Sequence, residues 1–202
     1  IEYRLFQEIS ENILKKTMDI QHAAEMIAEL DCLLSFADVS SRNRYARPRI
    51  TSGYKMRIME GRHPVIERTA GDFIANDTIM QEDASTFIIT GPNMAGNSTY
   101  MRQSALIVIM AQMGCFVPAA EAEIGVVDRV FTRVGASDDI SSGQSTFMME
   151  MTQTALILNN ASSRSFIILD EIGRGTSTFD GMALAWSVAE YITKNIKAKT
   201  LF

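Results

Sequence analysis

The spacing of apolar residues predicts a helical segment at the start of the chain. Between residues 2 and 38 apolar side chains recur every three or four positions, and neither Pro nor Gly interrupts the pattern. The stripe consists of Phe6, Ile9, Ile13, Ile20, Ala24, Ile27 and Leu34, widened near its end by Leu30, Leu33 and Ala37. One continuous helix would be roughly 55 Å long, and two shorter helices in a bundle are the alternative. We expect the stripe to pack on neighbouring helices.

After residue 49 the pattern changes to short apolar runs that alternate with helical spacing. Residues 56–59 and 65–67 are strand-like and flank a turn at 61–64, and another short strand follows 73–77. Further strands are predicted at 87–89, within 124–134, at 165–169 and from residue 200. Helices are predicted from Ser98 to a glycine cap at Gly114, over 144–159 and over about 182–194. This alternation predicts an α/β domain with a largely parallel central sheet and a small antiparallel β part.

The last two predicted helices each have a face that we expect to be buried. For 144–159 this face contains Phe147, Met148, Met151, Ala155 and Leu158. For 182–194 it contains Leu184, Trp186, Val188, Ala189 and Ile192.

A polar segment at residues 40–48 separates the two regions. Four arginines lie in or beside it, at Arg42, Arg44, Arg47 and Arg49, with Tyr45 between them. Such a cluster can contact a phosphate backbone, but a solvated linker, or docking to the acidic remainder of the chain, is the better interpretation. We therefore predict a helical lever or connector segment at 1–48 and a second domain at 49–202.

Composition excludes some classes of protein. The chain has 202 residues, of which 47% are hydrophobic, enough for a substantial core, and its net charge of −5 argues against a main DNA-binding surface. No run of about 18 apolar residues occurs, so we expect no membrane span. Cys32 and Cys115 have no CxxC spacing and no nearby His, which predicts reduced core thiols of a cytosolic, non-secreted protein.

The strand predicted at 87–89 leads into a loop with the pattern of a phosphate-binding loop. Gly91, Gly96 and Ser98 match G-x-x-x-x-G-K-[ST], and a helix follows. Glycines allow backbone N–H groups to point inward, and the helix presents its positive end to an anion. Asn97 stands at the lysine position, so it can donate a hydrogen bond but carries no charge. The loop alone is therefore equally compatible with an ordinary strand-to-helix turn.

Two adjacent carboxylates follow the most apolar predicted strand. Phe166, Ile167, Ile168 and Leu169 indicate a strand buried on both faces, and Asp170 and Glu171 come directly after it. Acids in this position are costly unless they bind a cation. A structural pair with Arg174 is one interpretation. The phosphate-loop pattern favours the other, in which Asp170 holds Mg²⁺ and Glu171 polarises a water molecule, with both loops emerging from neighbouring strands.

Four sequence blocks together resemble one protein family. They are TGPNMAGNSTYMRQ, GRHPVIE, GASDDISSGQSTFMMEM and ILDEIGRGTSTFDGMALAW. They resemble the ATPase domain of the MutS family of DNA mismatch-repair proteins, and AAEMIAELDCLLSFA resembles the end of that family's helical lever region. The similarity covers essentially the whole chain. It implies an ABC-type P-loop NTPase fold, ATP and Mg²⁺ as ligands, and a homo- or heterodimer formed through the ATPase domain.

The resemblance also implies a role for individual residues. The phosphates would be cradled by Gly91, Pro92, Asn93, Met94, Ala95, Gly96, Asn97, Ser98 and Thr99. Ser98 and Asp170 would hold the metal, and Glu171 would be the general base or would orient the attacking water. Adenine would contact Phe73 and Ile74, and Ser145 would face the γ-phosphate of the nucleotide bound by the other subunit.

Two departures from the family pattern bear on activity. The family has Lys where this chain has Asn97, and it has a strand ending in a Thr-His pair soon after the point where this chain stops. We therefore expect residues 49–202 to be a truncated ATPase domain. Loss of a charged partner costs roughly 2–5 kcal/mol, so nucleotide affinity and turnover should fall by about two to three decades.

The resemblance implies that the chain is the nucleotide switch of a DNA clamp. Domains absent from this chain would bind mismatched DNA, a MutL-type protein would be a partner, and the location would be the bacterial cytoplasm, or the nucleus or an organelle. A non-catalytic, nucleotide-independent dimerisation module of the same fold is one alternative. Another ABC-type ATPase is a second, although its LSGGQ signature is missing from the sequence.

Overall fold

The computed structural model describes residues 1–69, 73–92, 95–133 and 146–202. The chain divides into two compact units, Ile1–Asn43 and Arg44–Phe202. The assignment of a connector to 1–48 and an ATPase domain to 49–202 stays a prediction.

The first unit contains two helices, α1 (Glu2–Leu14) and α2 (Thr17–Arg42). The expected continuous helix is interrupted because Lys16, with φ −109° and ψ 8°, leaves the α-helical region of backbone conformation. The apolar stripe stays exposed, with Ile27 66% accessible, and Ser40 is the only buried residue of the two helices. The two helices therefore do not bury the stripe against each other as a bundle. Cys32 is exposed, so the prediction that it is a core thiol is wrong, whereas Cys115 is buried in the second unit.

The second unit contains a mixed four-stranded sheet in the order β1-β5-β2-β3. Its strands are β1 (Arg49–Thr51), β2 (Met56–Gly61), β3 (Asn76–Met80) and β5 (Glu121–Gly125). β2 pairs antiparallel with both β3 and β5, and β1 runs parallel to β5. The small antiparallel part predicted from the sequence is confirmed.

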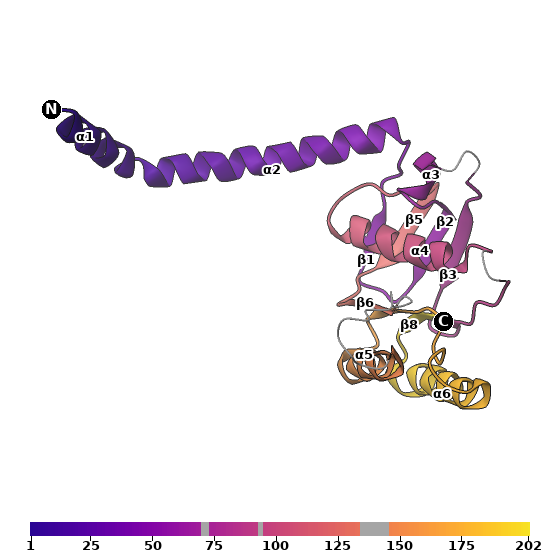
Figure 1. Cartoon of the computed structure of the whole chain (residues 1–202). Coiled ribbons are helices and arrows are strands. Elements are labelled where there is room, and N and C mark those ends of the chain that lie inside the picture. The colour runs from indigo at the N-terminus through magenta and orange to yellow at the C-terminus, as the bar shows by residue number, and fades with distance from the viewer. Residues whose placement is uncertain (70–72, 93–94, 134–145) are drawn as a thin grey trace. The chain divides into compact units, whose positions relative to one another are not determined.

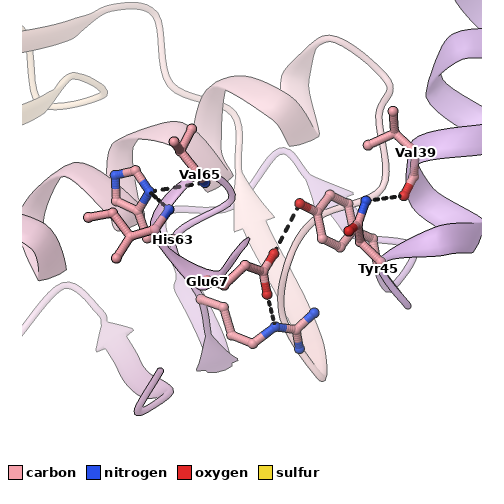
Figure 2. Close-up of polar contacts among 8 residues, drawn as sticks. Val39, Tyr45, His63, Val65 and Glu67 are labelled. Atoms are coloured by element: carbon pink, nitrogen blue, oxygen red, sulfur yellow. Dashed lines mark hydrogen bonds and ion pairs between the residues drawn. The ribbon is translucent and has the colours of Figure 1, made fainter. Parts of the chain in front are cut away.

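A short helix, α3 (Ile66–Thr69), replaces the strand predicted at 65–67. The cause is His63, whose Nδ1 accepts hydrogen bonds at 3.3 Å from the backbone N–H groups of Val65 and Ile66 (Figure 2). This side chain satisfies N–H groups that a helix start leaves without a partner. Glu67 accepts from the Tyr45 hydroxyl at 3.1 Å and from Arg62 Nε at 2.7 Å, which holds the short helix in place.

A second four-stranded sheet is parallel throughout and has the order β4-β8-β7-β6. Its strands are β4 (Thr86–Phe87), β6 (Val130–Arg133), β7 (Phe166–Leu169) and β8 (Lys199–Leu201). β4 is shorter than predicted, but the Ile89 N–H donates to the Phe202 carbonyl at 2.7 Å and continues the pairing. All four residues of β7 are buried, which confirms a strand covered on both faces.

Helices cover both faces of the parallel sheet (Figure 1). Phe166 and Ile168 of β7 belong to the core that includes α4 (Asn97–Gln112), and Gly114, with φ +86°, follows the end of that helix as predicted. Ile167 and Leu169 pack instead with residues of α5 (Thr146–Asn160) and α6 (Thr178–Tyr191). A π-helical turn at Ile192–Ile196 connects α6 to β8. This arrangement confirms an α/β fold with a parallel sheet.

The buried faces of α5 and α6 differ from the predicted ones. α5 buries Glu150, Thr154 and Ile157, whereas Met148, which was predicted to be buried, is 62% exposed. α6 buries Val188, and Ile192 is buried just beyond it as predicted, but Trp186 is 72% exposed. In α5 the cause is a buried polar contact made by Glu150, described below. Among the described residues, no helix combines the length and the apolarity that crossing a lipid bilayer requires.

Candidate nucleotide-binding site

The loops after β4 and β7 line one cavity of about 900 Å³. Residues 88–92 and 95–99 form one wall, and residues 169–172 with Arg174 form another. β8 lies between β4 and β7, so the two loops do not come from neighbouring strands as the sequence had suggested. They face the same cavity because the strands are parallel and their carboxyl ends share one edge of the sheet.

The described part of the glycine loop ends in a helix start suited to an anion. The Ala95 N–H donates to the Pro92 carbonyl at 3.1 Å, and Gly96 adopts φ +93°, a conformation that favours glycine. Gly96 is the N-cap of α4 and provides no side-chain hydrogen bond to the helix. Backbone N–H groups of the first turn therefore remain available, and Ser98 and Thr99 of this turn line the cavity.

Asn97 lies at the inner side of this loop. A methyl group placed on Gly91 would lie 3.2 Å from Asn97 Nδ2 and 3.3 Å from Asn97 Oδ1, so the amide group packs against the Gly91 backbone. Both residues also line the cavity. The side chain at the lysine position thus faces the loop, where it offers a neutral donor in place of a cation.

Asp170 and Glu171 occupy different environments at the tip of β7. Asp170 is 6% exposed, and within the part of the chain that the structure describes its carboxylate has neither a hydrogen bond nor an ion pair. Its backbone N–H donates to the Arg133 carbonyl at 2.7 Å, which fixes its position. A buried carboxylate without a protein partner suits a hard cation such as Mg²⁺.

Glu171 is more accessible and its backbone is strained. Its φ is +59°, which is uncommon for a residue other than glycine and is typical of functional sites. Its Oε2 lies 2.8 Å from Arg174 Nη1. The structural interpretation with Arg174 is therefore correct for Glu171 but not for Asp170.

A second cavity of about 520 Å³ adjoins the first and is lined by Phe73 and Ile74. The two cavities share Ile89, Ala95, Gly96, Asn97 and Thr99. The structure thus places the two residues expected to contact adenine beside the glycine loop. Asn93, Met94 and Ser145, also predicted to act in nucleotide binding, lie outside the described residues.

Sequence reasoning missed a buried charged pair close to the acidic tip. Arg133 Nη2 lies 3.8 Å from Glu150 Oε2, and both side chains are buried. Glu150 Oε1 also accepts a hydrogen bond from the Gly173 N–H at 2.5 Å. The only signal in the sequence is a glutamate between methionines, Met149 and Met151, on an otherwise apolar stretch.

Comparison with known proteins gives a consistent result over the whole chain. A family model described as MutS domain V matches residues 87–202. The DNA mismatch repair protein MutS of Alkaliphilus metalliredigens (strain QYMF) is 58% identical over 205 residues, covering 100% of this chain and 23% of that protein. The proteins of the same name from Caldanaerobacter subterraneus subsp. tengcongensis and Caldicellulosiruptor bescii are 57% and 58% identical, again over 100% of this chain. The chain spans 23% and 24% of the lengths of these two relatives.

Proposed function

The chain belongs to the MutS family, and its residues 87–202 match the ATPase domain known as MutS domain V; on this premise we propose that it binds ATP with Mg²⁺ in the cavity between the glycine loop and Asp170. The observation that carries this proposal is the shared cavity, which joins a helix start with available N–H groups to a buried carboxylate that has no partner among the described residues. The first favours phosphate and the second favours its metal ion.

Each side chain of the site then has a defined role. Ser98 and Asp170 would hold Mg²⁺, and the bound ion would supply positive charge to the phosphates. Phe73 and Ile74 hold the adenine in the adjoining cavity. Glu171 orients the attacking water and accepts its proton, and for this it must leave the ion pair with Arg174. That exposed pair contributes little, about 0–1 kcal/mol, so the rearrangement is inexpensive. Asn93, Met94 and Ser145 keep the roles that the family resemblance implies.

Asn97 weakens this site because it supplies no charge to the β- and γ-phosphates. The direct test is titration with Mg-ATP of this chain and of Asn97→Lys. We expect the lysine variant to bind and hydrolyse ATP about two to three decades better. Equal affinity and equal turnover in the two proteins would refute this account of the loop.

A non-catalytic dimerisation module is the second candidate function. The neutral side chain at position 97 favours it, since it removes a charge that hydrolysis requires. Sedimentation with and without Mg-ATP separates the two functions. Dimers that form equally without nucleotide support the module, whereas dimers that need Mg-ATP support the nucleotide switch.

In the whole protein we propose that this domain switches a DNA clamp between states. Other domains would bind mismatched DNA, a second ATPase domain would complete a homo- or heterodimer, and a MutL-type protein would respond to the nucleotide state. The relatives' name, DNA mismatch repair protein MutS, supports this role. Their bacterial sources are in keeping with a cytoplasmic location.

A further inference from the structure

We propose that Glu150 is a positioning residue that ties α5 to the loop at residues 171–175, so that the place of the Glu171 carboxylate depends on the place of α5. This role depends on the ATP hydrolysis proposed above, and Glu150 would be a further residue on which that reaction depends. Glu150 is 3% exposed and lies on the second turn of α5, and its Oε1 accepts the hydrogen bond from the Gly173 N–H. Gly173 is two residues from Glu171, so this bond fixes the backbone from which the Glu171 side chain extends.

A second contact joins the same two segments one helical turn earlier. A methyl group placed on Gly175 would lie 2.7 Å from Phe147 Cβ and 2.9 Å from Phe147 Cα. At Gly175 the loop backbone therefore lies closer to the backbone of α5 than a residue with a side chain at this position would allow. Phe147 and Glu150 are three positions apart on one side of α5, so both contacts hold the loop against the same side of the helix.

The loop also lies close to α6. Gly173 has φ +90°, and a methyl group there would lie 2.7 Å from both Cα and the carbonyl oxygen of Gly181 in α6. A strained residue such as Glu171 keeps its conformation only where its surroundings determine it from several sides. Here α5 and α6 provide those surroundings, and a shift of α5 is transmitted to the Glu171 backbone.

Arg133 connects Glu150 to Asp170. Its carbonyl accepts from the Asp170 N–H, while its guanidinium faces Glu150. The Nε and Nη1 atoms of Arg133 are buried without a hydrogen bond. Glu150 is thus the only carboxylate that forms an ion pair with this buried cation among the described residues. Replacing Glu150 alone would leave a buried charge and strongly destabilise the fold for reasons unrelated to catalysis, so the test removes both charges together.

The experiment compares R133M/E150Q with R133M/E150M in the Asn97→Lys chain. Glutamine keeps an oxygen that can accept from the Gly173 N–H, and methionine has a similar size but no such oxygen. We expect kcat for ATP hydrolysis to be about tenfold or more lower in R133M/E150M than in R133M/E150Q, because misplacement of a catalytic group by about 1 Å is costly. KM and nucleotide affinity should agree within about twofold, since the glycine loop is untouched. G175A should lower kcat in the same way.

Thr154→Ala is the matched control. Thr154 is buried on the same face of α5, one turn further on, and among the described residues its hydroxyl donates only to the Glu150 carbonyl within the helix. This variant should lose stability but keep kcat. Equal kcat in the glutamine and methionine variants, or a parallel loss of nucleotide affinity, would overturn the positioning role alone. Absence of hydrolysis in the Asn97→Lys parent would instead refute the proposed function and this inference with it.

Discussion

Lys199 places an ammonium group in the interior of the parallel sheet. It is 1% exposed, and its Nζ lies 4.0 Å from the centre of the Tyr54 ring. Burial and, to a smaller extent, the nearby Arg164 lower its pKa from 10.5 to about 8, and Asp128 opposes the shift. The cation–π contact only partly replaces the lost hydration.

Lys199→Met should therefore change how stability depends on pH. Between pH 8 and pH 10.5 the unfolded chain holds a proton that the folded chain has released, so the folded wild type gains stability as pH rises. We expect its free energy of unfolding, relative to that of Lys199→Met, to increase by about 3 kcal/mol over this range. Urea unfolding at pH 7.5, 9 and 10.5 measures this, with the exposed Lys55→Met as control. A constant difference would contradict the prediction.

His63 makes the stability of the fold depend on pH in the acidic range. Burial, helped by the nearby Arg102, lowers the pKa of His63 below the ordinary 6.5. The neutral ring accepts the backbone hydrogen bonds of α3 through Nδ1. The unfolded state then binds the proton first, so this contribution to stability is present above pH 6.5 and is lost as pH falls through that value toward the folded pKa. His63→Asn keeps an acceptor that does not titrate, and it should lose less stability than wild type between pH 7 and pH 5. Thermal unfolding at the two pH values measures this; equal losses would disprove the role.

At the scale of elements, α5 offers a direct test of which face is buried. Ile157 is 3% exposed and packs with residues of β7 and α6. Ile157→Ala should cost about 2–5 kcal/mol of unfolding free energy. Met148→Ala, on the exposed face, should cost less than about 0.5 kcal/mol. Chemical denaturation of the two variants compares them directly, and equal costs would mean that the helix is rotated from the position described.

The same helix shows where prediction from sequence succeeds and where it stops. Hydrophobic spacing correctly predicted α4, β7 and the alternation of strands and helices, because those elements bury continuous apolar surfaces. It did not predict the buried face of α5. The contacts of Glu150 with Arg133 and Gly173 turn the side that carries Glu150 toward the interior, although the neighbouring methionines are more apolar. Hydrophobic spacing also failed for α3, where a histidine cap decides the conformation.

For the site, motif spacing correctly located the two loops in the sequence, but it did not predict the order in the sheet of the strands that precede them. Gly96 with positive φ and a buried Asp170 follow from the chemistry of the motifs. The insertion of β8 between β4 and β7 depends on pairing between residues more than 100 positions apart, for which local pattern carries no information. The Glu171–Arg174 pair and the Phe147–Gly175 contact are likewise properties of the folded chain.

At the scale of the whole molecule, all described residues of the candidate site lie in the second unit. Both sheets, both hydrophobic clusters and both cavities lie within Arg44–Phe202. We therefore expect a chain of residues 44–202 to unfold at the same urea concentration as the full chain. It should also self-associate less in sedimentation, because the exposed apolar stripe of α1 and α2 is gone. A lower unfolding midpoint would show that residues 1–43 stabilise the second unit.

The position of β8 sets the order of events during protein synthesis. β4 forms backbone pairs with β8 alone in its sheet, and β8 in turn pairs with β7, yet β8 follows both in the chain. A nascent polypeptide can form the helices and the mixed sheet while still attached to the ribosome. The loops after β4 and β7 meet only after Lys199–Leu201 has left the exit tunnel, so the cavity between them should form in one step, after most of the second unit has been synthesised.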